Sequence, residues 1–466
     1  MLFFEIVNKD IYTTNKVEYL PCHLIHVNYM EFTKNIIQNK NLMKIIISLV
    51  AIANITSIYA QQIDISNAQE ILLKNNPKLK AIKKQVESLE KKIPQASSLE
   101  DPRIKLGLNN LPISNPSFKE SDMTSKEIGI IQMIPLFGKL SVREQIAVLY
   151  YQKAIETYRF YKSLLLHELR TNFYEIGYLK EYSAILEDTK KYLTLMLEIQ
   201  KSRSITGIGT LSDVLQVSVE LLKIDEELIN IHSTIAEKEQ MIIYLLGKTN
   251  YENVQINTGT IVSSVSIINL SYEDSLKNIA SENPELKLLS LQILIDEKEI
   301  NYKQKEYYPD MEVGLSYMQR DNSSQGMKRD DMFSVMVTFN IPAWFINRNI
   351  PAVQEMKLKK GESIALLDDK KNEVFFALNK IAINISKWEQ LHKLYSNSII
   401  PHLDTTFNTK LTQYKTVDTE FMKLIDTIRM RLDYQNRLLA IKKEYLIALS
   451  FMKFLSGDIS VETKGF

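Results

Sequence analysis

The stretch MFSVMVTFNI, residues 332–341, alternates between apolar and mainly polar side chains. Successive side chains of an extended strand point to opposite faces, so this pattern predicts a β-strand that has one apolar face. The predicted face carries Phe333, Val335, Val337, Phe339 and Ile341. The fold must therefore include β-structure with an apolar side.

A second stretch with the same period lies just before it. Residues 309–319 place Val313, Leu315 and Tyr317 in phase, and a polar, glycine-containing loop separates them from a strand at 331–341. Two alternating stretches joined by such a loop predict a β-hairpin.

A weaker version of this hairpin occurs earlier in the chain. Strands are expected at about 103–111 and 127–134, joined through a loop that contains two prolines. The alternation is less clear here, because Ile130 and Ile131 are adjacent. The chain is thus predicted to contain four strands in two hairpins.

The landmarks around these hairpins occur twice, a fixed distance apart. Self-similarity at one offset indicates that a single supersecondary unit is repeated. We therefore expect a first repeat at 61–250, a linker at 251–270, a second repeat at 271–460 and a tail at 461–466. The matched pairs are Pro77 with Pro284, Pro102 with Pro309, Gly107 with Gly314 and Pro135 with Pro342, all 207 residues apart, and Gly207 with Val417 and Gly247 with Gly457, 210 residues apart.

Helical periodicity dominates the remainder of each repeat. Prolines are absent between Pro135 and Pro284, as an uninterrupted helix requires. Helices over 141–204 and 351–414 would each be about 95 Å long at 1.5 Å per residue, which exceeds the width of a compact domain. Pro401 has no counterpart in the first repeat and predicts a kink in the second long helix.

Each long helix is followed by a helix with a heptad pattern. Apolar residues recur every three and four positions from Val214 to Leu245, and the same frame continues 210 residues later with more polar exceptions. Each repeat is therefore predicted to contain a long antiparallel coiled pair. A shorter helix opens each repeat, and in the first copy Ser66 and Gln69 are placed as a capping box.

The four strands also predict self-association. Strands of about ten residues are long enough to cross a lipid bilayer when tilted. Four strands cannot close on themselves, and open sheet edges are not tolerated in lipid, so several chains would have to share one barrel. The predicted fold class is mainly α with a transmembrane β-barrel portion; the alternative is a soluble sheet that clamps against the helices.

The amino end predicts export from the cytoplasm. From Met43 the chain has a short charged start, an almost wholly apolar segment at 45–58, and Ala60 before a polar continuation. This is the pattern of a secretory signal peptide, expected at 43–60, which leaves 1–42 as an upstream extension. The alternative is a retained amino-terminal anchor. The single cysteine, Cys22, lies in the extension, so cleavage would leave neither a disulfide nor a thiol.

Charge and motif content exclude several classes of function. Lys and Arg number 57 and Asp and Glu 56, which gives no basic character for binding nucleic acid. No Gly-rich phosphate loop follows a strand and no nucleophile with a base can be named, so we expect neither an enzyme nor a cofactor. We expect no metal site either, because the methionines do not cluster and no two histidines show ligand spacing on one helix face. The histidines considered are His167, His232, His392 and His402.

Short motifs mark corresponding points of the two repeats. They are Asn76-Pro77-Lys78-Leu79 and Asn283-Pro284-Glu285-Leu286 at the openings, Tyr308-Pro309-Asp310 before a strand, Gln132-Met133-Ile134-Pro135-Leu136-Phe137-Gly138-Lys139 after one, and Leu246-Gly247 at the end of the first coiled pair. In this order they resemble the TolC family of outer-membrane efflux proteins, over about 62–460. The resemblance implies a homotrimer with a twelve-stranded barrel in the outer membrane, four strands per chain, continued by an α-helical tunnel across the periplasm.

The same resemblance implies a function. It is that of a passive exit duct of a tripartite efflux system, for small molecules or metal cations, in the outer membrane of a Gram-negative-type cell. The implied partners are further copies of the chain, a periplasmic adaptor (membrane fusion) protein, a proton-driven inner-membrane pump and outer-membrane lipid. The turn after residue 133 is similar to that of the heavy-metal and cation efflux branch. The alternatives are a type I protein secretion duct and a secreted coiled-coil scaffold without a channel.

Carboxylates near the periplasmic end of the tunnel form a cation-sensitive constriction in this family. The positions that match here are Asp213 and Asp426, with Asp418 and Glu420 nearby, whereas Lys423 stands where a second copy of Asp213 would be. A threefold ring of such carboxylates would bind or select cations at a narrow mouth, so these four acids are the candidate gate residues. The alternatives are that Asp213 caps a helix and that Asp426 lies on a solvated helix face.

Overall fold

The computed structural model describes residues 61–207, 209–247, 254–267, 281–416 and 421–457 of the 466-residue chain. The predicted extension, signal peptide and tail, and parts of the predicted linker, lie outside these residues. The chain divides into two units, and in the smaller one the described residues are strand β1 (Gln61–Ile63) and the start of β4 (Val254–Ile256). These two strands form a two-stranded sheet. Every other element below belongs to the larger unit.

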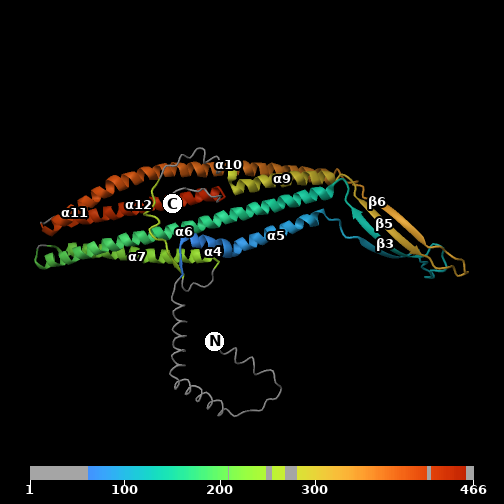
Figure 1. Cartoon of the computed structure of the whole chain (residues 1–466), viewed down its shortest axis with the longest axis horizontal. Helices are drawn as coiled ribbons and strands as arrows, with labels where there is room; N and C mark the ends of the chain where they lie inside the picture. The colour runs from blue at the N-terminus through green and yellow to red at the C-terminus, as the bar shows by residue number, and fades with distance from the viewer. Residues whose placement is uncertain (1–60, 208, 248–253, 268–280, 417–420, 458–466) are drawn as a thin grey trace, which may run out of the picture. The chain divides into compact units, whose positions relative to one another are not determined.

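The four predicted strands form one antiparallel sheet in the order β2-β3-β5-β6 (Figure 1). The strands are β2 (Arg103–Asn109), β3 (Ser125–Ile134), β5 (Met311–Gln319) and β6 (Met332–Phe339). Both hairpins therefore form, and the pairing of β3 with β5 joins the first repeat to the second. β2 and β6 are the two edges of this sheet within one chain.

The register separates the sheet into an apolar face and a polar face. Residues directly opposite one another share a face, as Ile130 does with Leu315 and Leu315 with Val335. The apolar face carries Ile104, Leu106, Leu108, Ile128, Ile130, Val313, Leu315, Tyr317, Phe333, Val335, Val337 and Phe339, together with Lys126, Gln132 and Gln319. The polar face carries Arg103, Lys105, Gly107, Asn109, Ser125, Glu127, Gly129, Glu312, Gly314, Ser316, Ser334 and Thr338, together with Ile131 and four methionines.

Helices account for most of the described residues. They are α4 (Ile65–Asn75), α5 (Pro77–Ser97), α6 (Lys139–Ile205), α7 (Leu211–Leu245), α9 (Pro284–Lys305), α10 (Asn349–Leu394), α11 (Ile400–Thr416) and α12 (Phe421–Leu455). The first long helix, α6, runs without interruption for 67 residues. The predicted fold class, mainly helical with four strands per chain and duplicated helical hairpins, is confirmed. Within the described residues, no helix is both long enough and apolar enough to span a lipid bilayer.

Two local predictions meet different outcomes. Pro401 predicts a kink in the second long helix. Just before Pro401, residues Tyr395–Ile399 form a π-helical turn between α10 and α11, so the helix departs from α geometry there. The predicted capping box of Ser66 and Gln69 is wrong. The cap of α4 is Asp64, whose carboxylate accepts the backbone N–H of Asn67 at 2.7 Å, so Ser66 already lies inside the helix.

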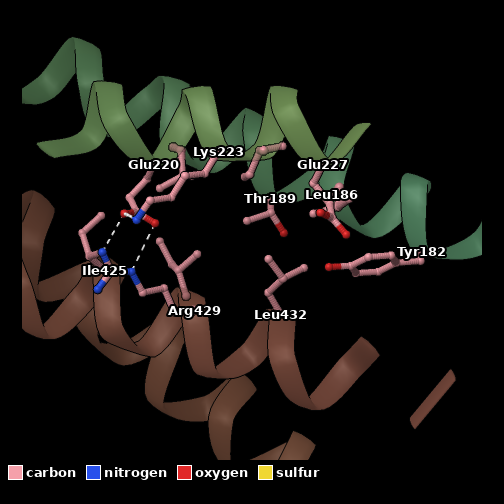
Figure 2. Close-up of a pocket in the computed structure, with 12 residues that line it drawn as sticks. Tyr182, Leu186, Thr189, Glu220, Lys223, Glu227, Ile425, Arg429 and Leu432 are labelled. Atoms are coloured by element: carbon pink, nitrogen blue, oxygen red, sulfur yellow. Dashed lines mark hydrogen bonds and ion pairs between the residues drawn. The ribbon is translucent and has the colours of Figure 1, made fainter. Parts of the chain in front are cut away.

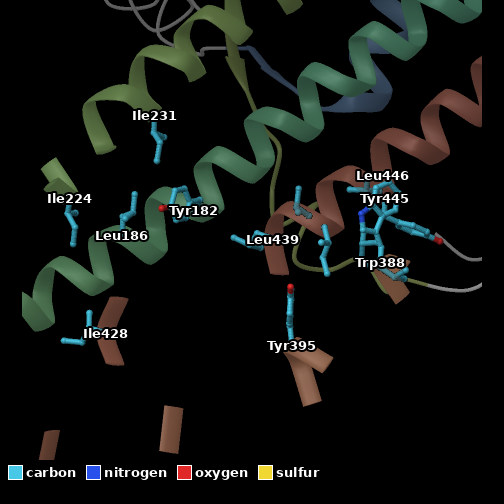
Figure 3. Packing of buried hydrophobic residues seen from close by; sticks show 14 of the residues in the cluster. Tyr182, Leu186, Ile224, Ile231, Trp388, Tyr395, Ile428, Leu439, Tyr445 and Leu446 are labelled. Carbon is cyan, nitrogen blue, oxygen red and sulfur yellow. The ribbon is translucent and has the colours of Figure 1, made fainter. Parts of the chain in front are cut away.

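α6 is the centre of the helical packing. It contacts α5 and α9 on its strand-proximal half and α7 and α12 elsewhere, so it touches helices of both repeats (Figure 1). The heptad seam of α7 is buried as predicted, through Val217, Ile224, Leu228 and Ile231. Figure 3 shows Ile224 and Ile231 near Tyr182 and Leu186 of α6, with residues of α12 completing the cluster.

Two asparagines join helices that are distant in sequence. The side chain of Asn76 accepts the N–H of Leu79, which caps α5, and its Nδ2 donates to the carbonyl of Leu245 at the end of α7 at 2.8 Å. Asn283 does the same in the second repeat, where it caps α9 and donates to the carbonyl of Leu455 at 3.0 Å. The Asn-Pro and Leu-Gly motifs are therefore the two halves of one junction, in which one helix continues end to end into another.

Candidate functional site

The strands meet the helices at a buried ion pair between the two repeats. Lys139 begins α6, and its Nζ donates to Oδ1 of Asp310 at 2.7 Å and to the carbonyl of Tyr308 at 2.8 Å. The chain turns from β3 into α6 through Phe137 and Gly138, whose φ angles of 56° and 71° are left-handed. The ring of Phe137 packs against that of Tyr308 with centroids 4.7 Å apart, which holds the non-glycine residue in this turn. Motifs from both repeats thus fix the sheet to the helices.

The polar face of the sheet carries two ion pairs between neighbouring or nearby strands. Lys105 of β2 donates to Glu127 of β3 at 3.0 Å, and the amide of Asn109 donates to the same carboxylate at 2.8 Å. Only 3% of the Glu127 side chain is exposed. Arg103 of β2 reaches Glu312 of β5 at 2.5 Å. Most side chains of the apolar face are exposed instead: Ile104 is 74% and Val335 62% exposed.

The loops at the far end of the two hairpins are fastened together by Arg329. Its guanidinium donates to the carbonyls of Phe118, Lys119 and Ser121 in the first loop and to Oδ1 of Asp122 at 2.6 Å. These bonds link a loop of the first repeat to a loop of the second. The two loops are therefore one ordered unit.

At the opposite end, the turn between α6 and α7 holds Asp213 in a capping box. Thr210 accepts the N–H of Asp213 at 3.2 Å, and the carboxylate of Asp213 accepts the hydroxyl of Thr210 at 2.8 Å. Nearby, Arg203 of α6 donates to the carbonyl of Tyr414 of α11 at 2.8 Å and stacks over its ring at 4.6 Å. This contact joins the helical hairpins of the two repeats. Gly207, with φ 74°, ends α6 in the left-handed conformation that favours glycine.

A second link between the repeats lies further along the same helices. Arg429 of α12 donates to both carboxylate oxygens of Glu220 on α7, at 2.6 and 3.2 Å, and Lys223 adds a bond at 2.9 Å (Figure 2). These hydrogen bonds lower the pKa of Glu220, with that from Arg429 the largest cause. The pair borders a cavity of about 250 Å³ between α6, α7 and α12. Burial raises the pKa of Tyr182, which also lines the cavity, to about 12.

Of the four acids predicted as gate residues, Asp213 and Asp426 lie in the part of the chain that the structure describes. Asp426 is half exposed on α12 and lies 3.3 Å from Arg429, so it shares that cation with Glu220. Asp213 is on another helix and contacts its own capping residue. Asp418 and Glu420 lie outside the described residues. The structure thus brings Asp426 into the Glu220–Arg429 link and leaves the gate role of all four acids a prediction.

The sequence did not predict the residues that make these links, which are Arg203, Arg429 and Glu220. One signal was present, because Glu220 lies between Val217 and Ile224 on the apolar side of the α7 heptad, where a charge needs a partner. Arg203 and Tyr414 gave no signal, since their helices come together only in the folded chain.

The histidines considered as metal ligands are dispersed. In the part of the chain that the structure describes, no three His, Cys, Asp or Glu side chains gather as a metal site would require. His167 lies on α6 with Nδ1 3.0 Å from the hydroxyl of Ser450 on α12, and against the rings of Phe451 and Phe454. Burial is the main cause that lowers the pKa of His167 to about 4.

Solved structures share this arrangement of strands and helices. The CusC channel matches with a TM-score of 0.69 at 13% identity, over 85% of this chain and 93% of that one. The outer membrane protein VceC of Vibrio cholerae matches with a TM-score of 0.69 at 12% identity, over 84% of this chain and 96% of that one. The fold is that of outer-membrane channel proteins.

Sequence comparison agrees with the fold. Residues 69–248 match the outer membrane efflux protein family. Toxin and drug export protein A of Aggregatibacter actinomycetemcomitans is 21% identical over 257 residues, 54% of this chain and 54% of that protein. The chain spans about half the length of the curated relatives it matches. Residues 69–248 therefore resemble the outer membrane efflux protein family, and the described chain shares its fold with the two solved structures.

Proposed function

We propose that the chain is the outer-membrane channel of a tripartite efflux system and serves as a passive exit duct. The observation that carries this proposal is the two-faced sheet, with an exposed apolar side and a side of paired charges and hydroxyls. An apolar face is suited to lipid, and a polar face is suited to a water-filled passage.

The edges of the sheet support assembly from several copies. Within one chain β2 and β6 have no strand on their outer sides in the described sheet. Backbone groups in lipid must be hydrogen-bonded, so β6 of one copy would pair with β2 of the next. Three copies then give the twelve-stranded barrel that the family resemblance implies, and the long helices continue it as a tunnel.

This proposed role requires two further components of the exporter. A duct of this kind supplies no energy, so we assign the energy to an inner-membrane pump and the connection to a periplasmic adaptor protein. The first candidate cargo comprises drugs, other small molecules and metal cations. Protein export is the second candidate, favoured by the relative whose name includes toxin export.

A heat-modifiability experiment tests the proposal. Outer membranes from cells that express the chain should contain a species that migrates as a trimer without heating and as a monomer after boiling. Purified protein should form conducting pores in planar lipid bilayers. Recovery of a soluble monomer from the periplasm would contradict the channel. Loss of a secreted protein from a deletion strain, with unchanged drug susceptibility, would favour the second candidate.

A further inference from the structure

The polar face of the four-stranded sheet has few charges, and they occur in balanced pairs. The charged residues on it are Arg103, Lys105, Glu127 and Glu312, two cations and two carboxylates. Lys105 contacts Glu127 at 3.0 Å and Arg103 contacts Glu312 at 2.5 Å. Each charge on this face therefore has an opposite charge beside it.

We propose that the strand-lined section of the duct presents a surface without net charge, suited to uncharged and amphipathic organic molecules and not to bare metal cations. This inference rests on the proposed function, because it takes the polar face as the lining of the passage. It narrows the cargo of that duct to one chemical class.

Paired charges are poor at concentrating ions. A section that selects cations needs a ring of like charges, as acidic rings provide in cation channels. Opposite charges about 3 Å apart largely cancel at the distance of a passing ion, and salt screens the remainder within about 8 Å. Glu127 is in addition covered by Lys105 and Asn109, so its carboxylate is not open to a cation in the passage.

The uncharged part of the face favours contact with organic molecules. On β6, Met332 and Met336 alternate with Ser334 and Thr338, and the register sets Met318 directly opposite Met332 and Met336 opposite Gly314. Met133 of β3 lies on the same face. Thioethers are polarisable and flexible, and they are frequent on surfaces that bind varied apolar ligands. The serine and threonine hydroxyls on the same face can form hydrogen bonds with such ligands.

The remaining charged residue of the four strands, Lys126, does not lie on the polar face. Lys126 lies opposite Leu108 and Gln319, on the apolar face. It is paired with Asp321 at 3.1 Å and lies over the ring of Phe118 at 4.9 Å. It therefore supplies a control position with the same charge on the other side of the sheet.

Reversal potentials across a KCl gradient in planar bilayers test the inference. Glu127→Gln should shift the reversal potential toward anion selectivity, because it leaves Lys105 unpaired. Lys105→Gln should shift it toward cation selectivity by a similar amount. The double variant K105Q/E127Q should return to the wild-type value, and Lys126→Gln should leave it unchanged. If the double variant instead matches Glu127→Gln alone, Glu127 acts as a free charge and the inference is wrong.

Further readouts separate this inference from the proposed function. A chain that forms no pores would contradict the proposed duct itself, whatever its lining. A deletion strain should become more sensitive to amphipathic organic compounds; sensitivity to copper or zinc alone would overturn the cargo class. If Glu127→Gln fails to assemble as a trimer, the more exposed pair of Arg103 and Glu312 provides the same set of single and double variants.

Discussion

Lys139 and Asp310 form an ion pair that joins the start of α6 in one repeat to the residue just before β5 in the other. Nζ and Oδ1 are 2.7 Å apart, and only 6% and 15% of the two side chains are exposed. Asp310 also accepts the backbone N–H of Leu136 at 3.3 Å. One carboxylate thus holds the turn from β3 into α6 against the beginning of β5.

Asp310→Ala should destabilise the protein strongly, because it leaves the buried Lys139 ammonium without its opposite charge. Removal of one member of a buried pair costs about 3–5 kcal/mol. Glu87→Ala is the control, since Glu87 pairs with Lys84 at 2.6 Å on an exposed part of α5, where loss of the pair should have little effect on stability. Thermal unfolding of the purified protein measures both. Equal losses in the two variants would show that the junction does not depend on this ion pair.

Gly247→Ala should disrupt the end-to-end junction of α7 with α5. A Cβ there would lie 2.9 Å from both the carbonyl of Asn75 and the ring of Pro77, and the φ of 68° is left-handed. Gly326→Ala is a matched control, because its φ of 80° imposes similar backbone strain with no atom within 4 Å of the new Cβ. We expect Gly247→Ala to lower the melting temperature clearly more than Gly326→Ala. Similar shifts would mean that the glycine serves only its own backbone conformation.

His167 should make the protein less stable as the pH falls from about 6.5 to about 4. The pKa of His167 is about 4 in the fold and near 6.5 for an exposed histidine, so in this range the unfolded chain binds a proton that the folded chain does not. The shift corresponds to about 3 kcal/mol. Because the ring is partly exposed to solvent, the loss should be smaller, on the order of 2 kcal/mol, and complete below pH 4. His167→Gln should reduce this pH dependence in thermal unfolding, and His232→Gln, at an exposed position on α7, should leave it unchanged. An unaltered pH profile for His167→Gln would contradict the assignment.

Val337→Arg should block assembly in the membrane. Val337 lies on the apolar face of β6, and an arginine that faces lipid near the bilayer centre costs about 2–4 kcal/mol in each chain. Thr338→Arg is the matched control, because the neighbouring residue lies on the polar face. The yield of heat-modifiable trimer in outer membranes should fall only for Val337→Arg. Trimer loss in Thr338→Arg alone would reverse the assignment of the two faces.

Arg429→Gln should loosen the helices near the turn of α6 into α7. It removes two bonds to Glu220 and so weakens the connection between the hairpin of the first repeat and that of the second. If the helices form a closed end of the duct, cells should admit more large antibiotics such as vancomycin, and single-channel conductance should rise. Arg437→Gln, which breaks an exposed pair with Asp433 within α12, should have neither effect.

The same link should depend on pH. Because Arg429 lowers the pKa of Glu220 below its usual 4.5, the stabilisation is complete above pH 4.5 and is lost as the pH falls through the lowered value. Conductance of the wild-type channel should therefore increase in acid, and Glu220→Gln should show the acid level at neutral pH. Acid activation that persists in Glu220→Gln would require another titrating group.

Much of the fold could be read from the sequence because its determinants are local. Alternation predicted a strand at 331–341 where β6 (Met332–Phe339) forms, and heptad spacing predicted the buried seam at Val217 and Ile224. Side-chain period and proline spacing report the backbone conformation of their own segment. A local error arose at Ser66, because Asp64 was an equally good cap two residues earlier.

The sequence by itself determined the four strands, the long helices and their duplication. Only the tertiary structure decided which distant charges meet: Lys139 with Asp310, Glu220 with Arg429, and Lys105 with Glu127. The first two pairs join residues of different repeats, and strand register sets the third. Periodicity carries no information about such pairing, because it depends on how separate elements pack and not on the conformation of either one.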